Sequence, residues 1–147
     1  MSFGGIFSAT DISASGLAAE RLRMEVVANN IANAHSTRSA SGGPFRRQDV
    51  VFASALDDAQ SSDGPNGHSL SGVRVASVQE DLSELPRVYR PGHPDADKDG
   101  FVTMPNVKPA NEMVDLITAS RAYEANLRTL RTFREMTEQA LNVLRGS

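Results

Sequence analysis

Apolar residues recur at alternating steps of three and four positions over the last quarter of the chain. The positions in this series, most of them apolar, are Met113, Leu116, Ser120, Tyr123, Leu127, Leu130, Arg134, Thr137, Leu141 and Leu144. Such spacing places side chains on one face of an α-helix. Pro109 before the series, Gly146 after it, and Asn111 or its neighbour as N-cap are typical boundary signals. The sequence therefore predicts a helix roughly 50 Å long, which needs a partner for its apolar face.

A second amphipathic segment near the N-terminus is the expected partner. The chain has no Pro between Ser8 and Ala34, and a three-four alternation puts four apolar residues on one face: Leu17, Met24, Val27 and Ile31. A weaker row, Ala18, Leu22 and Val26, lies on another side. A single partner helix would leave this second row exposed, so we expect the N-terminal helix to contact more than one neighbour.

Three asparagines, Asn29, Asn30 and Asn33, lie near the end of this predicted helix, where Asn is a poor helix former. Asn33 is suited to a C-cap. Asn29 lies four residues before it on the same face, so both amides could hydrogen-bond across an interface in a packed assembly. Buried amides cost stability but fix register.

The middle of the chain has the chemistry of turns and short strands. The stretches Ser36–Gly43 and Gln60–Gly72 are rich in Ser, Gly, Asp and Asn, which is typical of loops. Four stretches with β-branched or aromatic residues are predicted as short strands: Phe45–Phe52, Val73–Val78, Pro86–Arg90 and Phe101–Met104.

These patterns predict a mainly α fold with a small β insert, in which the two terminal helices pack as a coiled-coil-like pair around an irregular β region. The expected divisions are an N-terminal helix within 1–35, a β and loop region over 36–108, and a C-terminal helix within 109–147. The two helices together would form one core domain.

One motif has the form of a metal site. Asp95, Asp97 and Asp99 alternate before Gly100, as in the first half of a calcium-binding EF-hand loop. Asn106 stands where the bidentate Glu should be, and Pro residues upstream exclude the flanking helix. The alternatives are an Asp-rich turn, which uses only side-chain oxygens and a positive φ at Gly100, and a weak calcium site incidental to the main function.

The remaining sequence argues against catalysis and nucleic-acid binding. The chain has 15 basic and 18 acidic residues without a contiguous basic block, and no Cys. His35, His68 and His93 lie in separate predicted loops, without a nucleophile motif beside them. We therefore expect no enzyme activity, no cofactor, no metal and no small-molecule substrate.

The N-terminus carries neither a basic start nor an apolar run of the length a secretory signal needs, so any export is expected to proceed without a cleaved signal peptide. No segment approaches the roughly 20 apolar residues of a membrane span.

Several motifs resemble those of flagellar rod and hook proteins. The N-terminal motifs are Ser15-Gly-Leu17, Arg23-Met24, Val27-Ala-Asn-Asn-Ile-Ala-Asn-Ala34 and Ser36-Thr37. Four more narrow the resemblance to basal-body proteins of the proximal rod: Gly43-Pro-Phe-Arg-Arg47, Pro91-Gly-His-Pro-Asp-Ala-Asp-Lys-Asp-Gly100, Met104-Pro-Asn-Val107 and Ser120-Arg-Ala-Tyr-Glu-Ala-Asn126. Distal rod and hook proteins share the terminal motifs but carry a longer central insert.

The resemblance implies a structural subunit that assembles helically into the drive shaft and export channel linking the membrane ring to the distal rod, and that flagellum assembly and motility require. It implies a periplasmic location in the basal body. The implied partners are further copies, other rod proteins, membrane-ring and distal rod proteins, and the flagellar type III export apparatus. A calcium-regulated module and, further behind, a hydrolase using Asp95, Asp97 or Asp99 are the alternatives.

The residues expected at subunit interfaces come from both helices. They are Leu17, Met24, Val27, Asn29, Asn30, Ile31, Asn33, Met113, Leu116, Tyr123, Leu127, Leu130, Leu141 and Leu144.

Overall fold

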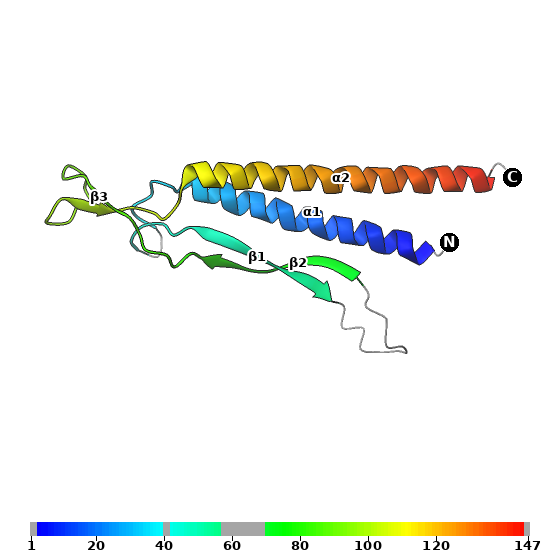
Figure 1. Cartoon of the computed structure of the whole chain (residues 1–147), viewed down its shortest axis with the longest axis horizontal. Coiled ribbons are helices and arrows are strands. Elements are labelled where there is room, and N and C mark those ends of the chain that lie inside the picture. The colour runs from blue at the N-terminus through cyan, green and yellow to red at the C-terminus, as the bar shows by residue number, and fades with distance from the viewer. Residues whose placement is uncertain (1–2, 40–41, 57–69, 146–147) are drawn as a thin grey trace. The chain divides into compact units, whose positions relative to one another are not determined.

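The computed structural model describes residues 3–39, 42–56 and 70–145, and their side chains over 9–39, 42–55 and 72–145. In chain order, its elements are α1 (Phe3–Ala32), β1 (Gln48–Leu56), β2 (Leu70–Glu80), β3 (Arg87–Tyr89), β4 (Phe101–Thr103) and α2 (Pro109–Arg145) (Figure 1). The prediction of a mainly helical fold with a small β insert between two long helices is confirmed.

The helix boundaries follow local chemistry. Asn33 comes directly after the last residue of α1, and both its backbone N–H and its side-chain amide donate to the carbonyl of Asn29, each at 3.0 Å. Asn33 therefore caps the helix as predicted. The prediction of an N-cap at Asn111 or its neighbour is wrong, because α2 already begins at Pro109. The missing N–H and fixed φ of a proline suit the first helical position, and Asn111 instead lies in the first turn.

The four strands form two separate two-stranded sheets, β1 with β2 and β3 with β4. In the antiparallel β3–β4 pair, Arg87 is opposite Thr103 and Tyr89 is opposite Phe101. β1 starts later than the predicted Phe45, because the amide of Phe45 donates to the carbonyl of Ser36 at 3.0 Å and not to a strand. Most of the predicted Gln60–Gly72 loop lies outside the described residues, and β2 includes its last part.

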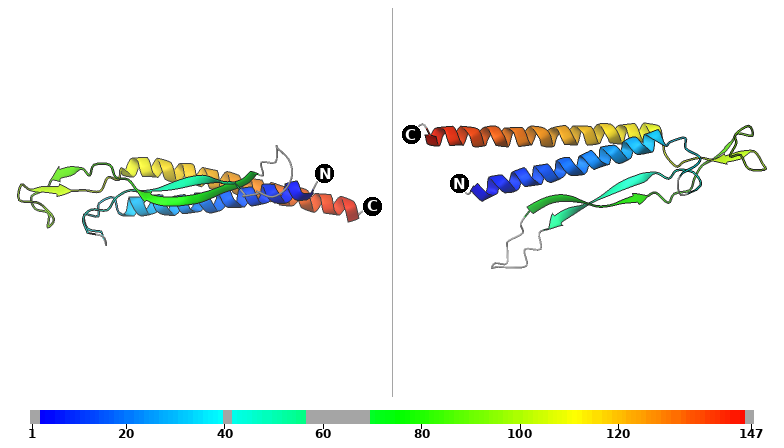
Figure 2. Two further views of the ribbon diagram at one scale, coloured as in Figure 1. Left: turned by 90° about the horizontal axis from the view of Figure 1, so that it is seen from below. Right: turned by 180° about the vertical axis from the view of Figure 1, so that it is seen from behind.

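The chain forms two compact units, to which α1, β1, β2 and α2 all contribute. We call residues 22–51 and 77–118 the central unit, and residues 1–21, 52–76 and 119–147 the terminal unit. In each unit the α1 segment lies between the α2 segment and the β1–β2 segment (Figure 2). The expected division at residues 35 and 108 stays a prediction.

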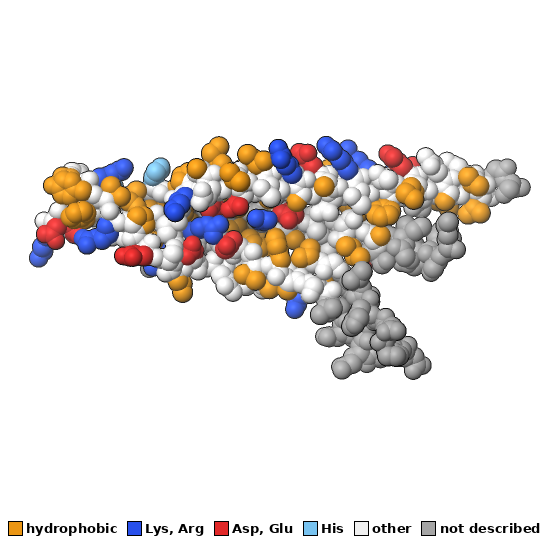
Figure 3. Space-filling model, viewed as in Figure 1, with side chains coloured by type: hydrophobic (Ala, Val, Ile, Leu, Met, Phe, Trp, Pro, Cys, Tyr) orange, Lys and Arg blue, Asp and Glu red, His pale blue; other side chains and the backbone are white. Residues whose placement is uncertain are grey.

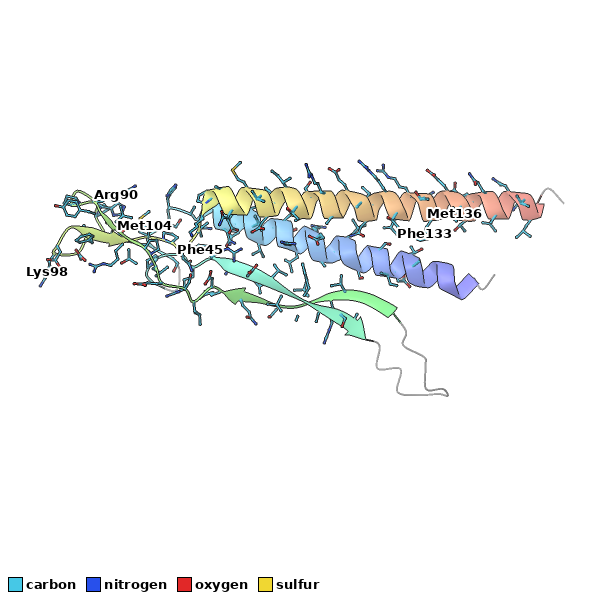
Figure 4. The ribbon with its side chains drawn as sticks, in the orientation of Figure 1. Phe45, Arg90, Lys98, Met104, Phe133 and Met136 are labelled. Atoms are coloured by element: carbon cyan, nitrogen blue, oxygen red, sulfur yellow. The ribbon has the colours of Figure 1, made fainter. Side chains whose placement is uncertain are left out.

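The central unit has a core of apolar side chains that includes sizeable ones. The buried apolar residues are Val26, Val27, Ala34, Val102, Met104 and Val107. Figure 4 labels Met104 together with the half-buried Phe45 on the segments that connect the elements of this unit. Two polar side chains, Asn30 and Glu112, are also buried.

The terminal unit is covered less completely. Among its described side chains only those of Ser13, Ala19 and Ala119 are buried, and all three are small. Larger apolar side chains, such as Leu127 and Phe133, are half-buried. No helix within the described ranges combines the length and apolar character that crossing a membrane would need.

Candidate functional site

The side chain of Asn30 holds the first residue of β1 as a neighbouring strand would. Its amide nitrogen donates to the carbonyl of Gln48 at 2.8 Å, and its oxygen accepts from the backbone N–H of Gln48 at 2.9 Å. The same nitrogen donates to Glu112 Oε2 at 2.9 Å. A fully buried amide must find such partners, because an unpaired buried polar group costs free energy.

Glu112, in the first turn of α2, connects Asn30 to Arg47. Its side chain is 1% exposed, and its Oε1 accepts from Arg47 Nε at 2.6 Å. Two more carboxylates lie near the guanidinium, Asp49 at 3.1 Å and Asp115 at 3.6 Å. The hydrogen bond with Glu112 is the main reason that the pKa of Arg47 is raised above its ordinary value. Both oxygens of the buried carboxylate are thus paired, and the charge is compensated.

A second asparagine, Asn106, binds the residue before Gln48. Its oxygen accepts from the backbone N–H of Arg47 at 2.8 Å. Its nitrogen donates at 2.9 Å both to the carbonyl of Asp81 and to the hydroxyl of Ser83. Two consecutive backbone amides at the start of β1 are therefore bound by asparagine side chains from two different segments.

We call Asn30, Arg47, Gln48, Asn106 and Glu112 the polar clamp. It joins the last turns of α1, the start of β1 and the first turn of α2 within the central unit. Sequence reasoning singled out Asn30 as an interface residue but missed Arg47, Asn106 and Glu112. An acidic residue in the first turn of a helix normally complements the helix dipole at the surface, so the sequence carried no signal that Glu112 is buried.

The three aspartates of the EF-hand-like motif do not converge. Asp97 Oδ1 accepts the backbone N–H groups of Asp99 at 3.0 Å and Phe101 at 2.8 Å, and Gly100 has a φ of 80°. The prediction of an Asp-rich turn is confirmed. The bond from Phe101 is the largest cause of a lowered pKa at Asp97, which also pairs with Arg87.

Asp95 fastens this turn to the loop after α1. Its carboxylate accepts from the hydroxyl of Thr37 at 2.8 Å and from Arg38 Nε at 2.6 Å. The Thr37 bond is the first cause of a lowered pKa at Asp95. The carboxylates of this motif therefore contribute their charge as well as their hydrogen-bonding oxygens, because two of them pair with arginines. No group of three or more potential metal-ligating side chains occurs over the described ranges.

A hollow of about 650 Å³ lies beside these ion pairs in the central unit. Its lining includes Thr37, Arg38, Arg87, Asp95 and Asp97, whose polar groups already bond one another. This lining does not offer an unpaired nucleophile with an adjacent base, which acyl or phosphoryl transfer would require.

The predicted interface residues differ in their exposure. Val27 and Asn30 are buried within the chain, whereas Asn29 is exposed and accepts a hydrogen bond from Asn33 Nδ2 at 2.9 Å. The half-buried members are Leu17, Met24, Ile31, Asn33, Leu116, Tyr123, Leu127 and Leu130. Met113 is 58% exposed, Leu141 44% and Leu144 65%.

Further apolar side chains are exposed on α2 that the three-four series did not include. Val114 and Ile117 lie in the central unit, and Met136 and Val143 lie in the terminal unit. Apolar side chains are visible at the surface along α2 in Figure 3, and Figure 4 labels Met136 near Phe133. Clustered exposed apolar side chains are typical of surfaces that contact another protein.

Two family models match the ends of the chain. The model of flagella basal body rod proteins matches residues 11–38, and the model of the C-terminal part of flagellar basal body rod FlgEFG proteins matches residues 98–143.

Curated relatives match the chain nearly from end to end. The flagellar basal-body rod protein FlgC of Borreliella burgdorferi is 44% identical over 97% of this chain and 99% of its own length. The proteins of the same name from Bacillus subtilis and Salmonella typhimurium are 38% and 41% identical, over 93% and 90% of this chain and 97% and 93% of their own lengths. The similarity covers both helices and the β insert between them.

Proposed function

The chain belongs to the FlgC family of flagellar basal-body rod proteins, and we propose on this premise that it is a structural subunit of the proximal rod. It functions by packing into the rod and not by catalysis. The observation that carries this proposal is the similarity to FlgC proteins along nearly the whole chain, which includes the short β insert as well as the helices. In this role the subunit is part of the shaft that transmits rotation and part of the channel through which later components pass.

Deleting the gene for this chain from its flagellated host tests the proposal. Cells without the subunit should be non-motile and lack hooks and filaments, because distal parts need the rod beneath them. A plasmid copy of the intact chain should restore all three. Normal filaments in the deletion strain would contradict the proposal.

The two terminal helices supply the surfaces for assembly in this proposal. Residues 1–35 and 109–147 form the axial core, and the region 36–108 lies outside it. The exposed apolar residues Met113, Leu141 and Leu144 suit contacts with neighbouring subunits, because contact with a neighbour would remove their apolar surface from water. The half-buried members of the predicted set would then be covered partly by their own chain and partly by a neighbour.

Identical subunits that contact one another through two different surfaces form helical arrays when the rotation between them does not close a ring. We therefore propose head-to-tail contacts between copies, with other rod proteins, the membrane ring and the distal rod as further neighbours. The low burial of the terminal unit supports this arrangement, since only small side chains are buried there among those described.

The subunit reaches the periplasmic rod through the flagellar type III export apparatus, without cleavage of a signal peptide. Mass spectrometry of the protein from purified basal bodies tests this route. The N-terminal peptide should begin at Met1, or at Ser2 after removal of the initiator. A mature N-terminus well inside the first helix would contradict it.

A further inference from the structure

We propose that the polar clamp sets the register of α1, β1 and α2, and that it keeps the central unit folded in the isolated subunit. The boundary between the two units falls inside each long helix, near Arg21 in α1 and Thr118 in α2.

Asn30 ties α1 to both β1 and α2. Its amide forms three hydrogen bonds, two with the backbone of Gln48 and one with Glu112, and these partners are 18 and 82 residues away. Sliding α1 along β1 by one residue would break the two bonds with Gln48, and sliding it along α2 would break the bond with Glu112. Either slip would leave buried polar groups unpaired. Apolar contacts alone tolerate such slips more easily, because they have no required direction.

Asn106 fixes the residue that precedes β1. Asn106 binds the N–H of Arg47, the residue next to Gln48, and its nitrogen is occupied by Asp81 and Ser83. Two neighbouring amides, one just before β1 and one at its first residue, are therefore fixed by two segments that come from opposite sides of the β insert in sequence. A register error in either segment leaves one of them unpaired.

The two units differ in what holds them together. The central unit combines the clamp with buried Val26, Val27, Val102, Met104 and Val107. Among the described side chains of the terminal unit, only those of alanine and serine residues are buried. Ordering a backbone costs about 1 to 2 kcal/mol per residue, so a unit with little complete burial depends more on contacts from outside.

Amide hydrogen exchange on the purified full-length chain, verified as a monomer by light scattering, tests the inference. Amides of Leu22–Ala32 and Met113–Thr118 should exchange at least about tenfold more slowly than those of Thr10–Arg21 and Ala119–Leu144. The amides of Arg47 and Gln48 should be among the protected ones. Equal exchange in both units, whether fast or slow, would overturn the inference.

Exchanging the hydrogen-bond donor and acceptor between Asn30 and Glu112 tests the clamp itself. Asn30→Asp keeps the size but removes the donor and places a carboxylate against Glu112, so protection of the central unit should fall by at least about tenfold. Adding Glu112→Gln supplies a donor for the new carboxylate and should recover a large part of the loss. Asn29→Asp, at an exposed position that only accepts a side-chain hydrogen bond, is the matched control and should leave protection unchanged.

The results for these variants test the clamp independently of the proposed function. If Asn30→Asp leaves protection unchanged, or the double variant recovers nothing, the clamp does not set the register. That failure would leave the rod assignment intact, because the deletion strain tests the assignment independently. Recovery in the double variant would show that the pairing between these two side chains, and not merely the presence of polar groups, orders the unit.

Discussion

Asn30 and Glu112 are 82 residues apart in sequence, and their buried side chains share a hydrogen bond of 2.9 Å. This bond ties the end of the first helix to the start of the second within the central unit. Through Arg47 and Gln48, the same two side chains also hold the first strand. The position of the helices in this unit therefore depends on directed polar contacts as well as on apolar burial.

Truncating Glu112 should destabilise the protein strongly. Glu112→Ala removes the acceptor of the 2.6 Å bond from Arg47 and one partner of Asn30, and we expect a loss of about 2 to 4 kcal/mol in the free energy of unfolding. Urea denaturation followed by circular dichroism measures the loss. Glu124→Ala on the same helix is the control. Its exposed contact with Arg128 is worth no more than about 0.5 kcal/mol. Similar losses of unfolding free energy in both variants would show that the buried carboxylate contributes no more to stability than an exposed one.

Gly72 should be intolerant of any side chain, for reasons of backbone and space together. Its φ is 90°, and an added Cβ would lie 2.3 Å from Ser15 Oγ and 3.2 Å from the Cα of Ile12. Ser15 Oγ accepts the N–H of Val73 at 3.1 Å, so Gly72→Ala should break the attachment of β2 to α1 in the terminal unit.

Gly42 provides the comparison for that change. Its φ is 85°, but nothing lies within 4 Å of an added Cβ, so Gly42→Ala carries only the left-handed backbone penalty of about 1 to 2 kcal/mol. Thermal unfolding should show a clearly larger drop for Gly72→Ala. Equal drops in melting temperature would mean that the contact between the added Cβ and Ser15 is relieved without a loss of stability.

Acid should weaken the central unit through Asp95 and Asp97. The pKa of Asp95 is lowered chiefly by the hydrogen bond from Thr37, and that of Asp97 chiefly by the N–H of Phe101. A lowered pKa in the folded state contributes stability that is present above the ordinary aspartate pKa of about 3.9 and is lost as the pH falls through the folded value. The melting temperature should therefore fall below about pH 4.

The double variant Asp95→Asn, Asp97→Asn should melt at a lower temperature near pH 7 and lose less on acidification, because neither amide titrates. Melting curves between pH 7 and pH 3 compare the two proteins. Parallel curves for the variant and the wild type would show that these carboxylates do not contribute to the pH dependence.

A charge in the apolar series of α2 should block assembly. Leu127 is half-buried in the terminal unit, and Leu127→Asp would place an unpaired carboxylate where the proposed contacts exclude water, at a cost of several kcal/mol. Rods purified from cells that express this variant should contain none of it, and the cells should be non-motile. Leu127→Met keeps volume and polarity and should assemble normally. Motile cells with Leu127→Asp would refute the assignment of this face.

Periodicity and boundary residues predicted the helices and the insert, because those signals are local. Pro109 begins α2 and Asn33 caps the end of α1 as the sequence indicated. The polar clamp was beyond such reasoning. Nothing in the neighbourhood of Asn30 indicates that its partners are Gln48 and Glu112, since pairing at that distance depends on how the whole unit packs.

The exposure of individual positions was equally hard to predict. The three-four series treats Tyr123 and Leu141 alike, yet the first is half-buried and the second is 44% exposed. Their difference depends on which other segments lie beside each turn of α2. A periodic pattern identifies a face of a helix but not what covers it.

The most direct measurement of the central claim is an electron cryo-microscopy reconstruction of basal bodies isolated from the host of this chain. The account predicts density for α1 and α2 of this sequence in the proximal rod, between the membrane ring and the distal rod, with Met113, Leu141 and Leu144 against neighbouring subunits. A complete rod in which every subunit is assigned to other proteins would contradict it.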